Sequence, residues 1–238
     1  MTVLSLIRHG QGSFGTDNYD RLSPHGHWQA QTLGEYFASA GIAFDQLYCG
    51  ALTRQRETAA GLNQALNGQA QTPRILPALD EYPTKGVFGR YMPPLLEADV
   101  ELRDIFSRDR TAAGRDRSLS RRVFFPVITA WMNDTGEADG EFESFGGFCD
   151  RVSRAVTDVA SQAEPDQRIA MVTSAGVIAV AVQMALNLPP ETFARVAWQV
   201  HNASVTCLAI DHGTLELRRF NSTMHLEATG RADALTWL

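Results

Sequence analysis

The sequence predicts an α/β fold in which a mainly parallel sheet lies between two layers of helices. Strand-like apolar runs alternate with helix signals along most of the 238 residues, a pattern typical of sheets covered on both faces. With 44% hydrophobic residues, the chain can bury a sizeable core, and its length fits one domain that carries an insertion. We therefore expect residues 1–238 to form a single three-layer sandwich.

The first strand and the first helix have clear signals. Residues 3–7 form a short apolar run, which predicts a largely buried strand. Ser23 is suited to cap a helix that has Pro24 at its first position and ends at Gly41.

Two more strands flank a second helix. We expect strands over residues 46–49 and 74–77. Thr53 is the natural cap of the helix between them, which should reach about residue 67 and stop at Gly68.

The regular alternation lapses over residues 82–140. This stretch reads as helical pieces rich in Arg and Asp, interrupted by Pro93, Pro94, Gly114 and Pro126. We interpret it as a helical insertion packed over the C-terminal edge of the sheet, where insertions commonly shape substrate choice.

The last part of the chain returns to the α/β pattern. Ser144 should open a helix whose apolar face is Phe145, Phe148, Val152, Val156 and Val159. A strand over residues 168–173 leads into a helix from Ala175. Residues 205–210 and 215–220 flank a four-residue turn, which predicts a hairpin and makes the last strand antiparallel.

Composition excludes several classes of protein. A net charge of −6 and a pI near 5.5 argue against nucleic acid as a partner, because such proteins usually carry a basic field. The N-terminus lacks a secretory signal, and the apolar run over 175–188 is too short to span a bilayer. We expect a cytoplasmic protein with no membrane partner. The spacing of Cys49, Cys149 and Cys207 suggests neither a disulfide framework nor a metal site.

The first strand ends on Arg8, His9 and Gly10, at the edge where open α/β sheets bind ligands. Arginine offers a permanent cationic fork, histidine a nucleophilic nitrogen, and glycine a backbone that a bulky anion can approach. The three residues together are suited to phosphoryl chemistry. Arg54 after the second strand, Glu81 after the third and Ser174 after the fourth should reach the same edge.

These residues resemble the histidine phosphatase superfamily (phosphoglycerate mutase-like), whose first strand ends in Arg-His-Gly. The segment Tyr-Asp-Arg-Leu-Ser-Pro at 19–24 and the block around Arg54 at 51–59 are also similar to that family. The resemblance implies that His9 becomes phosphohistidine and that Arg8 and Arg54 bind the phosphoryl group. An arginine in the first turn of a helix would act with the free N–H groups there to hold a dianion.

The resemblance implies that Glu81 is the proton donor, with Asp80 as its neighbouring rival. A carboxylic acid with a raised pKa could protonate the leaving alkoxide and later activate water. The resemblance implies no cofactor and no metal.

The sequence departs from the family pattern at the turn after the fourth strand. The family has a second histidine there, and this chain has Ala175. The backbone N–H groups of Ala175 and Gly176 at the start of a helix, with the hydroxyl of Ser174, are plausible substitutes in binding the phosphoryl oxygens. His201, which precedes the fifth strand, is a further candidate for this role.

Two classes of function remain open. The first is a phosphatase acting on a small phosphomonoester, with a phosphoglycerate mutase-type phosphotransferase as a close variant. The second is a regulatory module that binds phosphate or phosphorylated molecules but is catalytically impaired by Ala175. A serine hydrolase is disfavoured, because the turn at Ser174 lacks the first glycine of a nucleophile elbow.

The cluster Arg115, Arg117, Arg121 and Arg122 is either a solvated face or a substrate-steering surface. Neither the physiological substrate nor the oligomeric state can be predicted from the sequence.

Overall fold

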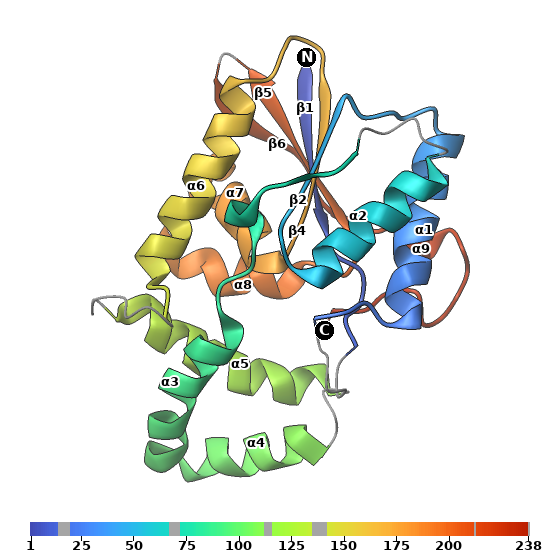
Figure 1. The fold of residues 1–238 in the computed structure, drawn as a ribbon. Coiled ribbons are helices and arrows are strands. Elements are labelled where there is room, and N and C mark those ends of the chain that lie inside the picture. Colours follow the sequence, from blue (N-terminus) through green and yellow to red (C-terminus); the bar gives the residue numbers. More distant parts are fainter. Residues whose placement is uncertain (14–19, 67–71, 112–115, 135–141, 212, 238) are drawn as a thin grey trace.

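The computed structural model describes residues 1–13, 20–66, 72–111, 116–134, 142–211 and 213–237, and its centre is a six-stranded mixed sheet (Figure 1). The strands are Thr2–Arg8 (β1), Gln46–Cys49 (β2), Arg74–Ile75 (β3), Arg168–Thr173 (β4), Val205–Asp211 (β5) and Thr214–Ser222 (β6). They lie in the order β3-β2-β4-β1-β5-β6. β1 to β4 pair in parallel, whereas β5 runs antiparallel to both of its neighbours. The predicted mainly parallel sheet with an antiparallel edge is confirmed.

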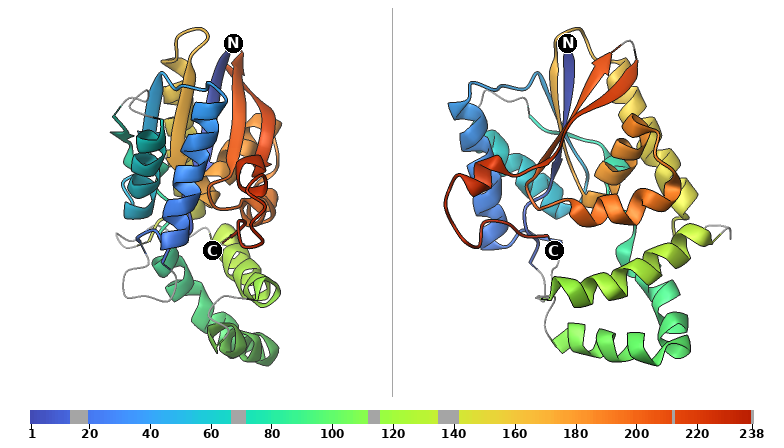
Figure 2. Two further views of the ribbon diagram at one scale, coloured as in Figure 1. Left: turned by 90° about the vertical axis from the view of Figure 1, so that its right-hand side faces the viewer. Right: turned by 180° about the vertical axis from the view of Figure 1, so that it is seen from behind.

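Helices cover both faces of the sheet, as the alternating pattern predicts. Those outside the insertion are Pro24–Ser39 (α1), Thr53–Ala65 (α2), Phe145–Ser161 (α6), Ala175–Leu186 (α7), Phe193–Gln199 (α8) and Met224–Glu227 (α9). α1 and α2 pack together on one face, and α6 and α7 lie on the other, with α8 packed against α7 (Figures 1 and 2). The three-layer architecture is therefore confirmed.

The capping signals at two helices act as predicted. The hydroxyl of Ser23 accepts a hydrogen bond from the N–H of Gly26 at 3.0 Å, and Gly41 follows α1 with a φ of 64°. The hydroxyl of Ser144 accepts from the N–H of Gly147 at 3.1 Å. The predicted apolar face of α6 is buried throughout: Phe145, Phe148, Val152, Val156 and Val159.

Two local predictions are wrong. Thr53 is the first residue of α2 and not its cap, because the N–H groups at this helix end are bound by carboxylates that come from elsewhere in the chain. The third strand is only Arg74–Ile75, because a 3₁₀ turn begins at Pro77. The predicted stop at Gly68 lies outside the described residues.

The described part of the predicted insertion contains three helices, which are Thr84–Ala98 (α3), Val100–Thr111 (α4) and Arg117–Asn133 (α5). They lie beyond the C-terminal ends of the parallel strands (Figures 1 and 2). Trp131 of α5 is fully buried, with its ring 4.7 Å from Tyr82 and 5.8 Å from Phe148 of α6. This aromatic packing ties the three helices to the sheet domain.

The prolines do not interrupt these helices, contrary to the prediction. Pro93 and Pro94 lie inside α3, and Pro126 lies inside α5. A proline inside a helix removes one backbone hydrogen bond. Pro93 and Pro94 are on the exposed side of α3, so water can satisfy the carbonyl groups that lose a partner. Gly114 lies outside the described residues.

Cys49, Cys149 and Cys207 are free thiols. Within the described ranges, no helix has the length and apolarity needed to cross a membrane.

Candidate active site

Four chain segments that are far apart in the sequence meet at one edge of the sheet. β1 ends at Arg8, which lies in register with Thr173 at the end of β4, and β2 ends at Cys49 beside them. β5 begins at this edge because it runs antiparallel to β1, with Val205 paired to Ile7. The loops at these strand ends therefore surround one region, at the edge of the sheet where the insertion helices lie (Figure 1).

His9 is held in one orientation and one tautomer. It is 4% exposed, and its Nδ1 lies 2.7 Å from the carbonyl oxygen of Gly10. Because a carbonyl only accepts, Nδ1 carries the proton and Nε2 carries the lone pair. Burial, together with the charges of Arg54 and Arg8, lowers the pKa of His9 well below its usual value. His9 is therefore a neutral imidazole at pH 7.

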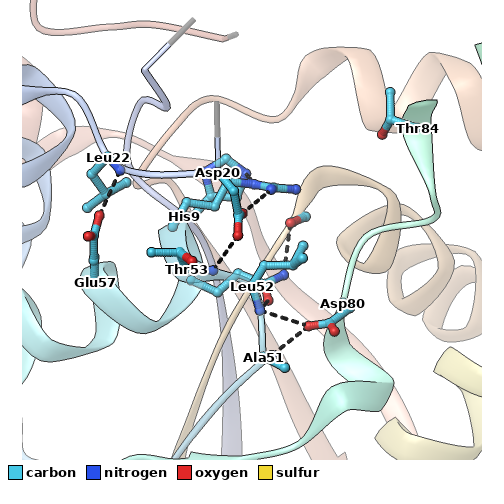
Figure 3. Close-up of polar contacts among 12 residues, drawn as sticks. His9, Asp20, Leu22, Ala51, Leu52, Thr53, Glu57, Asp80 and Thr84 are labelled. Atoms are coloured by element: carbon cyan, nitrogen blue, oxygen red, sulfur yellow. Dashed lines mark hydrogen bonds and ion pairs between the residues drawn. The ribbon is translucent and has the colours of Figure 1, made fainter. Parts of the chain in front are cut away.

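Arg54 contacts Nε2 of His9 directly. Its Nε–H donates to Nε2 of His9 at 3.1 Å, and its Nη1 donates to Oδ1 of Asp20 at 2.7 Å. The other oxygen of Asp20 accepts from the backbone N–H of Thr53 at 2.9 Å (Figure 3). Asp20 thus fixes Arg54 against the start of α2. The sequence analysis quoted Asp20 within a family-like segment but assigned it no role.

Asp80, the rival of Glu81, points elsewhere. Its Oδ1 accepts from the N–H groups of Ala51 at 2.6 Å and Leu52 at 3.3 Å (Figure 3). A carboxylate at a helix N-terminus satisfies donors that lack helical partners. Asp80 therefore stabilises the loop before α2 and does not line the cavity described below.

Glu81 lies across from His9 at the start of α7. Its Oε2 accepts from the N–H of Gly176 at 3.0 Å, and its Oε1 accepts from the N–H of Tyr82 at 3.3 Å. Burial raises the pKa of Glu81, and these hydrogen bonds and the charges of Arg54 and Arg8 only partly oppose it. The carboxyl group is thereby favoured as a proton donor.

Arg8 is also buried and is held by backbone carbonyls. Its Nη1 donates to the oxygen of Val200 at 2.5 Å, and its Nη2 donates to that of Trp237 at 3.0 Å. These contacts come from the end of α8 and from the C-terminal segment. They hold the guanidinium group of Arg8 in one position in the cavity that His9 also lines.

A cavity of about 440 Å³ joins these groups. Five of the predicted site residues line it, namely Arg8, His9, Arg54, Glu81 and Ala175. Its remaining lining residues are Tyr82, Thr84, Lys85, Phe88, Ser120, Val123, Phe124, Gly176, Ala197, Trp198 and Trp237. Of this second set, only Gly176 was given a role from the sequence, because nothing in the local pattern of α3, α5 or the C-terminal segment shows that the fold brings the others to the strand ends.

Gly10, Ser174 and His201 do not line the cavity. A Cβ at position 10 would lie 2.4 Å from the carbonyl oxygen of Gly26, so glycine there permits close packing against α1. Ser174 is fully buried, and its hydroxyl accepts from Nε2 of Gln55 at 2.9 Å. His201 bonds to Asn221, with 3.0 Å between its Nδ1 and the amide nitrogen.

The described members of the arginine cluster also lie outside the cavity lining. Arg117 donates to the carbonyl oxygen of Trp198 at 2.7 Å. Arg121 lies over the ring of Phe125, and Arg122 pairs with Glu101 at 2.5 Å. Arg115 falls outside the described residues. The steering role of this cluster stays a prediction.

Among the residues that the structure describes, no group of three or more His, Cys, Asp or Glu could hold a metal ion. The cavity combines groups that can bind an anion with a side chain that can act as a nucleophile. Two guanidinium groups, one neutral imidazole and one carboxyl group with a raised pKa surround it. This combination suits the binding and transfer of a phosphoryl group.

Solved structures with the same architecture come from phosphatases. A phosphoserine phosphatase from Entamoeba histolytica matches 95% of this chain and 100% of its own, with a TM-score of 0.62 and 22% identity. A putative α-ribazole-5′-phosphate phosphatase from Escherichia coli matches 93% and 96%, with a TM-score of 0.61 and 24% identity. A mycobacterial glucosyl-3-phosphoglycerate phosphatase with inorganic phosphate matches 94% and 98%, with a TM-score of 0.61 and 21% identity. At these identities the likeness establishes the fold.

Sequence comparison gives the family. A 2,3-bisphosphoglycerate-dependent phosphoglycerate mutase from Bartonella quintana is 35% identical over 79 residues, which are 31% of this chain and 38% of the mutase. The model of the histidine phosphatase superfamily (branch 1) matches residues 4–118 and 114–223. The chain belongs to the histidine phosphatase superfamily.

Proposed function

We propose that this chain is a phosphatase that hydrolyses small phosphomonoesters through a phosphohistidine on His9. The observation that carries the proposal is the placement of His9, whose Nε2 carries a lone pair held by Arg54, in a cavity that Arg8, Arg54 and Glu81 also line. Membership of the superfamily supports the proposal. So do the names of the proteins with similar folds, which are phosphatases.

The first step transfers the phosphoryl group to His9. Arg54 exchanges its hydrogen bond to Nε2 for one to a phosphoryl oxygen, which frees the lone pair, and Arg8 neutralises further negative charge. Nε2 attacks phosphorus in line with the ester oxygen. As the N–P bond forms and the P–O bond breaks, the carboxyl group of Glu81 gives its proton to the leaving alkoxide.

The second step returns the enzyme to its starting state. Glu81, now a carboxylate, takes a proton from a water molecule, and the oxygen of that water attacks phosphorus. The N–P bond breaks, phosphate leaves, and His9 regains its lone pair on Nε2. Glu81 regains its proton, so the cycle balances without a cofactor.

Ala175 favours a second candidate function, that of a phosphate-binding protein with impaired turnover. Ala175 lines the cavity without a side-chain donor, and the neighbouring N–H of Gly176 already binds Glu81. Loss of one donor to a transition-state oxyanion costs about a hundredfold to a thousandfold in rate. In this second function the cavity would bind phosphate or a phosphorylated molecule and turn it over slowly.

One set of variants separates these functions. Hydrolysis of 4-nitrophenyl phosphate is measured for the parent chain, His9→Ala and Ala175→His, with the exposed His27→Ala as the matched histidine control. Rapid mixing followed by an alkaline quench, in which an N–P bond survives, tests for phosphate on His9 by mass spectrometry. Activity that is abolished only by His9→Ala supports the phosphatase. If the parent chain shows no hydrolysis and the Ala175→His variant does, the result supports the phosphate-binding protein with impaired turnover. If hydrolysis survives His9→Ala, the mechanism through a phosphohistidine on His9 is rejected.

A further inference from the structure

The cavity is polar at one end and apolar at the other. The polar end is made by Arg8, His9, Arg54 and Glu81, which would hold the phosphoryl group. The other lining side chains are mainly apolar, namely Tyr82, Phe88, Val123, Phe124, Ala197, Trp198 and Trp237. A group esterified to a phosphoryl group at the polar end shares the cavity with these side chains, and with the polar Thr84, Lys85 and Ser120.

Aromatic rings from three separate elements meet at the apolar end. The ring of Phe124 in α5 lies 5.1 Å from that of Trp198 in α8 and 6.4 Å from that of Phe88 in α3. All three residues line the cavity, and Phe88 and Phe124 are only partly buried, so their rings keep surface free for a ligand. Aromatic rings prefer to contact a further ring in stacked or edge-to-face geometry.

The charge of this end argues against a strongly acidic leaving group. Among the described residues that line the cavity, Lys85 is the one cation beyond Arg8 and Arg54. Lys85 is exposed in the first turn of α3, where water screens its charge. The other polar side chains of the lining, Thr84 and Ser120, are uncharged. A carboxylate among Phe88, Phe124 and Trp198 would therefore lose its hydration without gaining a buried cation as its partner.

We propose that the leaving alcohol of the substrate carries an aromatic ring, which packs among Phe88, Phe124 and Trp198. This inference rests on the proposed function for the position of the phosphoryl group. The expected substrates are phosphomonoesters of alcohols that carry an aryl group. They should be preferred over phosphorylated hydroxy acids and phosphorylated sugars. Burial of the ring and its contacts with the aromatic side chains would supply the selectivity.

The experiment measures binding, so that it does not depend on turnover. The affinities of 3-phenylpropylphosphonate and propylphosphonate for the parent chain are compared by isothermal titration calorimetry. The two compounds share a stable P–C bond and the same anionic group, and they differ only in the ring. We expect the phenyl compound to bind about tenfold more tightly, and a difference below about threefold would overturn the inference.

A variant series locates the ring. Phe124→Leu keeps apolar bulk but removes the flat ring, and it should reduce the advantage of the phenyl compound by about threefold or more. Phe106→Ala is the matched control, because Phe106 is an aromatic residue of α4 outside the cavity lining. An unchanged advantage in Phe124→Leu would place the ring elsewhere and reject the assignment.

Turnover then separates this inference from the proposed function. The inference predicts a higher kcat/KM for 3-phenylpropyl phosphate than for propyl phosphate, whose leaving alcohols have similar acidity. It also predicts that phosphoserine, 3-phosphoglycerate and glucose 6-phosphate are poorer substrates than the phenyl ester. A better rate with any of these three would contradict the inference while leaving the phosphatase intact. Selective phosphonate binding without phosphohistidine formation would support the inference and contradict the proposed function.

Discussion

Gly176 lies so close to Glu81 that no side chain fits between them. A Cβ at position 176 would lie 2.2 Å from Oε1 of Glu81, while the N–H of Gly176 donates to Oε2 at 3.0 Å. The first turn of α7 therefore holds the carboxyl group by its backbone. The same turn contains Ala175, which the family resemblance marks as the site of a missing histidine.

The first prediction concerns Gly176→Ala. The new methyl group should push the carboxyl group of Glu81 out of place and weaken proton donation, which contributes about a hundredfold to ten-thousandfold in enzymes. Hydrolysis of propyl phosphate should fall by about a hundredfold. Hydrolysis of 4-nitrophenyl phosphate should fall much less, because its leaving group departs without a proton. Steady-state kinetics with both esters measures how much kcat/KM falls for each of them.

Gly89→Ala is the matched control for this prediction. Gly89 is an exposed residue of α3, and a Cβ there would meet nothing within 4 Å. Alanine in a helix interior is favoured over glycine, so this variant should keep both activities. An equal loss on both esters in Gly176→Ala would mean that the substitution damages the whole site and not proton donation.

The second prediction concerns Asp20→Asn. The carboxylate of Asp20 joins the guanidinium group of Arg54 to the N–H of Thr53, at 2.7 and 2.9 Å. An amide can accept on one side only, so its NH₂ group would face a donor. We expect Arg54 to be misplaced and kcat/KM to fall by about tenfold to a hundredfold.

Glu101→Gln controls for the loss of a negative charge, because the pair between Glu101 in α4 and Arg122 in α5 is exposed to solvent. Both variants are assayed with 4-nitrophenyl phosphate, whose leaving group does not need Glu81. The proposed role of Asp20 would be rejected if Asp20→Asn hydrolysed this ester as fast as Glu101→Gln.

The third prediction concerns the protonation of His9. Burial is the main cause of its lowered pKa, and Arg54 and Arg8 add to it. The folded chain should therefore take up this proton only well below pH 6.5, the usual value for histidine. The unfolded chain takes up this proton near pH 6.5. As pH falls from about 6.5 towards the lower pKa of the folded chain, His9 should therefore lower the free energy of unfolding.

Nuclear magnetic resonance of the imidazole protons measures this titration, and His9→Gln assigns the signal. Arg54→Gln removes a nearby positive charge and should move the His9 midpoint upward. Because burial remains, the midpoint should still lie below the usual value. A midpoint at or above the usual value in the parent chain would contradict the neutral imidazole that the proposed first step requires.

The sequence predicted the fold well where local signals and tertiary packing agree. Ser23 and Ser144 cap helices because their hydroxyls meet the first-turn N–H groups, a contact that needs no other part of the chain. Thr53 carries the same signal, but Asp20 supplies the acceptor from 33 residues earlier in the chain. Long-range contacts of this kind leave no trace in the local pattern.

The same distinction applies to the candidate site. Arg8, His9, Arg54 and Glu81 lie at or shortly after the ends of parallel strands, so the topology brings them to the same edge of the sheet. His201 was placed near that edge from its position before the fifth strand. It lies there only because β5 runs antiparallel, which the sequence pattern did not specify. Phe88, Phe124 and Trp198 could not be found, because their convergence depends on how α3, α5 and α8 pack.

The fourth prediction concerns stability and the link between α2 and the loops of the candidate site. Gln55 is fully buried, and its Nε2 donates to the carbonyl oxygen of Leu79 at 3.1 Å and to the hydroxyl of Ser174 at 2.9 Å. It therefore joins α2 to the segments that carry Glu81 and Ala175. Gln55→Leu would bury the hydroxyl of Ser174 without this donor, so the free energy of unfolding should fall by about 2 kcal/mol.

Urea unfolding measures this loss, with Gln64→Leu as the matched control because Gln64 is an exposed residue of the same helix. The control should change the free energy of unfolding by less than about 0.5 kcal/mol. If Gln55→Leu were as stable as the control, the buried amide would not hold these segments together. A loss of stability with unchanged kcat/KM would show that Gln55 supports the fold without positioning Glu81, since Gly176 and Tyr82 hold that carboxyl group through their own N–H groups.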